Sequence, residues 1–171
     1  MRAAVVYESW FGNTQKVAEV IAEALGADAD VVLLSVDDPP PALEDLDLLV
    51  VGAPTHAHGL SSAMTRKSAL DRLGRKGASG TGVRGWLQQL PPGEGRRAAA
   101  FDTRAEKSVL LVGSAARGIA KRLERRGFEL VAPAESFFVL EIDGPLKDAE
   151  LERASVWAGT LTRGLVAAPS R

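Results

Sequence analysis

The sequence contains no cysteine among its 171 residues. The chain therefore forms no disulfides, uses no thiol nucleophile and binds no zinc or iron–sulfur cluster through cysteine. Aromatic residues make up only 5% of the chain, too few to favour an RNA-binding surface built on base stacking. No stretch approaches the roughly 20 apolar residues of a membrane span, and the short apolar run near Met1 meets Glu8 without a signal-peptide pattern. These absences predict a cytoplasmic protein with neither nucleic acid nor membrane as a partner.

The composition that remains is that of an ordinary globular protein. Hydrophobic residues make up 46% and charged residues 25%, and the length predicts a single domain over residues 1–171. The net charge of −1 conceals a segregation. Residues 1–60 contain two basic and ten acidic side chains, whereas residues 61–126 contain fifteen basic and five acidic ones. A basic middle third can mark the binding of nucleic acid, of phosphate groups or of an acidic partner.

Apolar runs and helical periodicity alternate along the chain. Strands are predicted over residues 3–7, 30–34, 46–52 and 97–101, with a fifth inside 128–140 that Pro133 interrupts. Helices are predicted from Gly12 to Gly26, over 84–90, from an N-cap at Ser114 to Gly127, and over 148–165. Strands that alternate with helices predict an α/β protein with a parallel sheet covered on both faces.

Ligands of such sheets bind beyond the carboxyl ends of the strands, so the loop after the first strand is informative. It contains Ser9, Gly12, Asn13 and Thr14 just before a helix begins. Hydroxyls, a glycine and the N–H groups of a helix start suit a bound phosphate. The loop lacks the lysine of a nucleoside triphosphate loop, which favours a phosphomonoester held without Mg²⁺. A plain helix start, with Asn13 or Thr14 as N-cap, is the alternative.

Residues 5–25, VVYESWFGNTQKVAEVIAEAL, resemble the flavin mononucleotide (FMN) phosphate loop and first helix of flavodoxin-like proteins. The form of the loop is most similar to that in the flavodoxin modules of flavo-diiron proteins. The resemblance implies a three-layer, doubly wound, five-stranded parallel sheet of order 2-1-3-4-5 that binds one FMN without a covalent bond. It assigns the phosphate to Ser9, Trp10, Phe11, Gly12, Asn13 and Thr14. Phe11 stands where short-chain flavodoxins commonly have threonine, so hydroxyls elsewhere and backbone N–H groups must replace that contact.

The loop after the third strand also follows the flavodoxin pattern, and the resemblance places it beside the isoalloxazine ring. The residues so assigned are Pro54, Thr55, His56, Ala57, His58 and Gly59. His56 occupies a place that is often Trp or Tyr, and a peptide near Gly59 is expected to hydrogen-bond flavin N5. Two alternatives stay open at this stage: the histidines are exposed loop residues, or they bind a metal together with Asp or Glu.

The loop after the fourth strand is the expected second flank of the ring, beginning with Asp102, Thr103 and Arg104. Flavodoxins usually place a tyrosine there, and this loop has no aromatic residue. Arg104 and Lys107 add positive charge, which would stabilise an anionic reduced flavin and raise its potential.

Residues 61–83 contain a basic stretch and a glycine-rich stretch. The glycine-rich stretch 77–82 follows no predicted strand, so it is interpreted as a flexible loop rather than a nucleotide fingerprint. The basic stretch over about 61–83 is predicted to be a long loop that serves as a lid, a dimer element or a docking site, or is merely solvated. A phosphorelay receiver would need an aspartate at the end of the third strand, where Val51, Gly52 and Ala53 stand.

The chain offers no hydrolytic triad and no second dinucleotide domain, which leaves redox chemistry carried by a flavin. The main hypothesis is an FMN-binding electron-transfer protein that exchanges electrons with a redox partner protein or a small-molecule acceptor. One alternative is an FMN-dependent reductase acting on NAD(P)H and quinones, possible also as a homodimer. A second is an interaction module with the same fold and no flavin.

Overall fold

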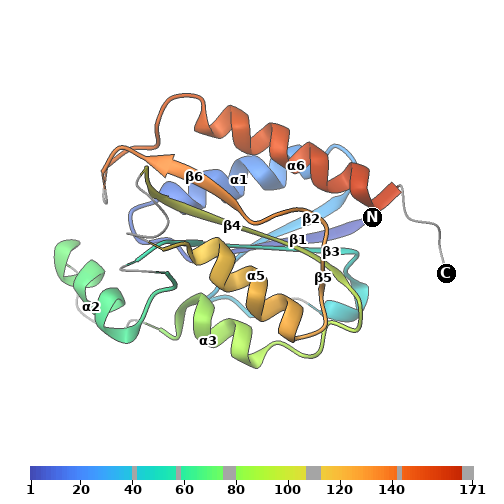
Figure 1. Cartoon of the computed structure of the whole chain (residues 1–171), viewed down its shortest axis with the longest axis horizontal. Coiled ribbons are helices and arrows are strands. Elements are labelled where there is room, and N and C mark those ends of the chain that lie inside the picture. Colours follow the sequence, from blue (N-terminus) through green and yellow to red (C-terminus); the bar gives the residue numbers. More distant parts are fainter. Residues whose placement is uncertain (40–41, 57–58, 75–79, 107–112, 142–143, 167–171) are drawn as a thin grey trace.

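One parallel sheet organises the computed structural model of the chain, which describes residues 1–39, 42–56, 59–74, 80–106, 113–141 and 144–166 (Figure 1). Its strands run in the order β2-β1-β3-β4-β5, and β6 also pairs with β4. The predicted order 2-1-3-4-5 is confirmed. The strands are β1 (Arg2–Tyr7), β2 (Asp30–Ser35), β3 (Leu48–Pro54), β4 (Arg97–Ala105), β5 (Glu129–Leu130) and β6 (Glu135–Val139).

The fifth position of the sheet is occupied by two short strands. β5 pairs with the start of β4 at Arg97 and Ala98, and β6 pairs with the second half of β4, from Phe101 onward. Pro133 lies between them and has no N–H to donate to the ladder. The predicted interruption at Pro133 therefore divides the fifth strand, and the sheet has six strands by count.

Helices cover both faces of the sheet. α1 (Asn13–Leu25) and α6 (Glu150–Val166) lie on one face, and α3 (Gly82–Gln89) and α5 (Ala115–Arg125) lie on the other (Figure 1). Successive strand residues alternate between the two cores, as strand geometry requires: Val5 belongs to the α1 and α6 side and Val6 to the α3 and α5 side. Within the described ranges, no helix has both the length and the apolarity needed to cross a bilayer.

The close approach of β3 and β4 depends on a glycine. A Cβ placed on Gly52 would lie 2.0 Å from the Cζ atom of Phe101, so only glycine leaves room for the aromatic ring. Phe101 is fully buried and makes edge-to-face contacts with Phe137 and Trp157, at centroid distances of 6.1 and 6.3 Å. This aromatic cluster anchors α6 to the centre of the sheet.

The prediction of a long loop over 61–83 is wrong, because residues 63–72 form helix α2 (Ala63–Arg72). The helix starts with a capping box, in which Ser62 and Thr65 each bond the other's backbone N–H. It lacks the apolar stripe that marks a packed helix, since only Arg66 and Ala69 are buried in it. Residues 75–79 of the glycine-rich stretch lie outside the described residues. A short 3-10 helix, η1 (Leu43–Asp45), precedes β3.

Candidate functional site

The carboxyl ends of three neighbouring strands, β1, β3 and β4, bring their loops together. The N–H of Glu8 donates to the carbonyl of Gly52 at 3.0 Å, and the N–H of Thr55 donates to the carbonyl of Thr103 at 2.9 Å. These bonds continue the pairing past the last residues of β1 and β3. The loops that follow the three strands are the predicted binding loops, and they therefore start side by side at this end of the sheet.

Gly12 is the N-cap of α1 and takes a left-handed conformation, with φ of 87°. It has no side chain to cap the helix, and a Cβ placed on it would meet nothing within 4 Å. The first N–H groups of a helix have no partner inside that helix, so this start offers donors to a ligand. The alternative N-caps, Asn13 and Thr14, are ruled out because both lie inside the helix. Ser9 Oγ accepts a bond from the N–H of Gln15 at 3.3 Å, which leaves the hydroxyl proton of Ser9 to donate elsewhere.

The side chains of Asn13 and Thr14 are buried and bonded to distant parts of the chain. Asn13 Nδ2 donates to the carbonyl of Gly144 at 2.6 Å, and Thr14 Oγ1 lies 2.7 Å from Thr103 Oγ1. The two side chains therefore fix the loop against the segment before α6 and against β4. The groups left to face a ligand are the Ser9 hydroxyl and the backbone N–H groups.

A buried carboxylate that the sequence analysis did not single out supports this loop. Glu8 is 3% exposed and accepts a bond from the indole N–H of Trp10 at Oε1 and one from the N–H of Val83 at Oε2, both at 2.8 Å. The sequence signal was present, because an acid stands directly after a buried strand. Phe11, the next residue of the loop, is half-buried.

The loop after β3 folds back as a tight turn. The N–H of His56 donates to the carbonyl of Gly59 at 2.8 Å, and the N–H of Gly59 donates to the carbonyl of His56 at 2.7 Å. Gly59 has φ of 146°, and a Cβ there would meet nothing within 4 Å. The tip of the turn, Ala57 and His58, lies outside the described residues, so their predicted roles stay predictions.

His56 is the titratable group of this turn. Its Nε2 atom is buried and has no hydrogen-bond partner among the described residues. Burial lowers the pKa of His56 below its ordinary value of 6.5, the charge of Arg66 lowers it further, and the carboxylate of Glu8 opposes both effects. The imidazole is therefore held neutral near pH 7, with an unused nitrogen beside the loops. In the described part of the chain, no cluster of three or more potential metal ligands occurs.

Thr55 and Asp102 accept hydrogen bonds from the first backbone N–H groups of α5. Asp102 is fully buried, and its Oδ2 accepts bonds from Thr55 Oγ1 at 2.9 Å, Ser114 Oγ at 2.7 Å and the N–H of Ala116 at 2.9 Å. Thr55 Oγ1 in turn accepts from the N–H of Ala115 at 2.8 Å. A carboxylate at a helix start is favoured by the helix dipole. The structure thus places both side chains in the scaffold beneath the loops, and Pro54 ends β3 beside them.

The prediction that residues 102–104 form a loop is wrong, because β4 continues to Ala105 and pairs there with β6. Arg104 is buried: its Nε donates to Ser136 Oγ at 3.1 Å, and its guanidinium lies 5.0 Å from the centre of the Phe138 ring. The polar residues 102–104 of β4 made this extension invisible to a search for apolar runs. Lys107, which was expected to act with Arg104, lies outside the described residues.

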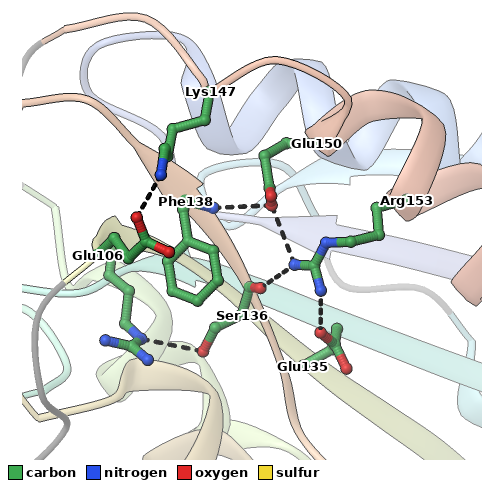
Figure 2. Close-up of polar contacts among 8 residues, drawn as sticks. Glu106, Glu135, Ser136, Phe138, Lys147, Glu150 and Arg153 are labelled. Atoms are coloured by element: carbon green, nitrogen blue, oxygen red, sulfur yellow. Dashed lines mark hydrogen bonds and ion pairs between the residues drawn. The ribbon is translucent and has the colours of Figure 1, made fainter.

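Polar contacts around Phe138 fasten β6 to the start of α6 (Figure 2). Arg153 donates to Glu135 Oε1 at 2.8 Å, to Glu150 Oε2 at 3.0 Å and to the carbonyl of Ser136. Glu150 also accepts a bond from the N–H of Phe138 at 2.9 Å. Arg104 joins this network through Ser136. Its guanidinium contacts β6 and does not face the loops at the carboxyl ends of the strands.

Comparison with known proteins agrees with this architecture. The family model for the flavodoxin domain matches residues 4–71. A flavodoxin from the domain Archaea superposes with a TM-score of 0.68 at 20% sequence identity, over 97% of this chain and 99% of that one. The chain has a flavodoxin-like fold. Oxidised flavodoxin 1 from Bacillus cereus superposes with a TM-score of 0.68 at 17% identity, over 95% of this chain and 98% of that one.

A larger protein contains the same fold as one of its parts. The metal-soaked flavodiiron core from Synechocystis superposes with a TM-score of 0.65 at 15% identity, over 99% of the flavodoxin-like chain and 37% of the larger one. The fold of this chain therefore occurs both in proteins of its own size and inside a longer one.

The residues of this flavodoxin-like chain fit a cofactor that ends in a phosphomonoester. Gly12 keeps the start of α1 open, and Ser9 supplies a hydroxyl proton. Gly59 has no side chain, and the space beside it is open. His56, in the same turn, supplies a buried nitrogen with no hydrogen-bond partner among the described residues. Phosphate at the first loop and a planar ring system beside the second are both compatible with these groups.

Proposed function

We propose that this chain binds FMN without a covalent bond and transfers electrons through it. The observation that carries the proposal is the start of α1, where Gly12 adopts φ of 87° and leaves the helix without a side-chain cap. A helix start with free N–H groups and a positive dipole end binds a phosphomonoester dianion without a lysine or Mg²⁺. The flavodoxin-like fold and the family match over residues 4–71 support the same cofactor.

Each part of the site has a separate task. The phosphate is held by the Ser9 hydroxyl and the N–H groups at the start of α1, and Asn13 and Thr14 keep that loop in place through Gly144 and Thr103. The turn closed by His56 and Gly59 flanks the ring. Bound FMN would supply reversible electron transfer.

The side chains at the site bind and orient the cofactor. Burial holds His56 neutral near pH 7, and Glu8 accepts bonds at both carboxylate oxygens. Asp102 accepts bonds at Oδ2, while its Oδ1 has no hydrogen-bond partner among the described residues. The electron source and acceptor are therefore external, and we propose a redox partner protein or a small-molecule acceptor.

Binding of FMN and of riboflavin, which lacks the phosphate, tests the proposal directly. The full chain should bind FMN with the visible absorption and quenched fluorescence of a bound flavin, and it should bind riboflavin far more weakly. Ser9→Ala should weaken FMN by about tenfold, the cost of one hydrogen bond to a charged group, and leave riboflavin unchanged.

Ser155→Ala, on the exposed side of α6, is the matched control and should change neither affinity. A chain that stays colourless with excess FMN overturns the proposal and favours the interaction module without flavin. If flavin binds, oxidation of NAD(P)H by a quinone without an added reductase would assign the reductase activity. Its absence would assign the electron carrier.

A further inference from the structure

A pocket of about 540 Å³ is lined by residues at the starts of α2 and α3. Its lining is rich in hydrogen-bond donors and contains no carboxylate. The lining residues are Ser62, Ala63, Arg66, Gly80, Thr81, Arg84, Gly85 and Gln88. Two guanidinium groups, one amide and two hydroxyls thus surround a space large enough for a small ligand.

Two helices begin at this pocket. Ser62 is the N-cap of α2, and Thr81 is the N-cap of α3 without a side-chain cap bond. Gly80 and Gly82 have φ of 55° and 61°, and a Cβ on Gly85 would lie 2.4 Å from Thr81 Cβ. These glycines let the chain turn tightly into α3 and let Thr81 lie against the helix. The end of the glycine-rich stretch that was interpreted as a flexible loop is therefore one wall of a pocket.

Arg84 is held in a fixed position by uncharged groups. Its Nε donates to the carbonyl of Ser61 at 3.2 Å, and its Nη2 donates to the carbonyl of Leu60 at 3.0 Å. Carbonyl oxygens orient a guanidinium but do not cancel its charge. A pre-oriented arginine loses less conformational entropy on binding a ligand than a free one.

Positively charged side chains extend from the pocket to α5. Burial lowers the pKa of Arg122, and the charges of Arg84 and Arg125 lower it further. The helix carries Arg117, Lys121, Arg122 and Arg125 against Glu124 as its single acid. Such repulsion between arginines is relieved by a bound anion.

Two acidic groups lie beside the glycines of the pocket wall. A Cβ on Gly80 would lie 2.8 Å from Asp37 Oδ1. A Cβ on Gly82 would lie 2.8 Å from Glu8 Oε2 and 3.1 Å from Arg66 Cδ. Both oxygens of that carboxylate already accept bonds, from Trp10 and Val83. Glu8 therefore offsets part of the charge of Arg66, and Asp37 places a further negative charge beside Gly80, whereas Arg84 is held by carbonyl oxygens.

We infer that this pocket is a second anion site, which binds the phosphate or pyrophosphate group of a small molecule. Planar guanidinium groups recognise phosphate oxygens with two donors, and the starts of α2 and α3 add favourable dipoles. The concave shape and small volume suit a phosphorylated metabolite better than a polymer or a flat protein surface. Free pyrophosphate and the diphosphate of a nucleotide share this chemistry.

Titration of the ¹⁵N-labelled full chain with inorganic pyrophosphate tests the inference residue by residue. Amide signals of Ala63, Thr81 and Arg84 should shift and saturate, whereas shifts confined to Asn13 and Thr14 would place the anion at the first loop and overturn the inference. This readout does not depend on FMN, so it separates the failure of this site from the failure of the proposed function. Tighter binding of adenosine diphosphate than of pyrophosphate would assign a nucleotide as the source.

Two neighbouring glutamines of α3 provide matched variants. Gln88 lines the pocket and Gln89 does not, and both are exposed. Gln88→Glu should weaken pyrophosphate binding about fivefold, because it places a negative charge beside the anion, and Gln89→Glu should leave it nearly unchanged. Equal effects of the two variants would overturn the inference. Arg84→Lys, which keeps the charge but loses the planar fork, should also weaken binding while the far-ultraviolet circular dichroism stays that of the parent chain.

Discussion

The backbone N–H of Val83 donates a hydrogen bond to Oε2 of Glu8 at 2.8 Å, although the two residues lie 75 positions apart. The other carboxylate oxygen accepts from the indole of Trp10. A single buried acid therefore joins the loop that precedes α1 to the start of α3. The proposed FMN loop and the proposed second anion pocket share this support, so a substitution of Glu8 should alter the structure of both.

Glu8→Gln should lower the free energy of unfolding by about 2 kcal/mol, because one of the two N–H donors would then face the amide NH₂ group and lose its acceptor. Urea denaturation followed by tryptophan fluorescence measures the change. Glu23→Gln, at an exposed position of α1, removes the same charge and should alter stability by less than about 0.5 kcal/mol. A similar effect of both substitutions would contradict the role of Glu8.

His56 should make stability depend on pH below about 6.5. Because burial lowers its pKa in the folded chain, the unfolded chain binds more protons in the window between 6.5 and the lowered value. The free energy of unfolding therefore falls as the pH drops through this window. His56→Gln should flatten this part of the profile, measured by urea denaturation at about pH 8 and about pH 5. Identical profiles for the two chains would refute the assignment.

Gly52→Ala should destabilise the fold by about 1–3 kcal/mol, the usual cost of overpacking a core. The added methyl group would meet the ring of Phe101, whose Cζ would lie 2.0 Å away. Phe101→Leu should be destabilising alone, yet the double variant should be more stable than the sum of the two single effects predicts. If the effects of the two single substitutions on thermal unfolding simply add in the double variant, the fold relieves the contact between the added methyl group and the ring of Phe101 in another way.

The hydroxyls of Thr14 and Thr103 form a buried pair, 2.7 Å apart. Thr103→Val should cost about 1–2 kcal/mol, since it leaves the hydroxyl of Thr14 buried without its partner. Adding Thr14→Val should recover part of that loss, because two apolar side chains of the same shape leave no unpaired donor. Chemical denaturation of the three variants distinguishes this pair from two independent contacts, which would give purely additive losses.

Much of the fold could be predicted because it depends on local patterns. The apolar stripe of α1, the N-cap at Ser114 and the continuous apolar run of β3 each carry their own signal. α2 could not be found in this way, since a capping box starts it and only Arg66 and Ala69 are buried along it. The second half of β4 was missed for a related reason, because Asp102, Thr103 and Arg104 are polar but buried by β6 and the helices.

The site was predictable as a location and less so in its details. The position of Gly12 between a strand and a helix predicts a phosphate loop from the sequence alone. The partners of Asn13 and Thr14 lie 131 and 89 positions away, and no local pattern reveals such bonds. The same holds for Glu8, whose importance depends on a helix that starts far along the chain.

The separation of acids and bases along the sequence becomes a separation in space. Exposed acids such as Glu19, Glu23 and Asp30 lie on α1 and the β2 edge, whereas Lys121 and Arg125 lie on the outer surface of α5. This separation gives the molecule an electric dipole moment that persists at its isoelectric point near 6.1, where the net charge vanishes. On a negatively charged electrode it would adsorb in one preferred orientation, with α5 toward the surface and the β2 edge toward the solution.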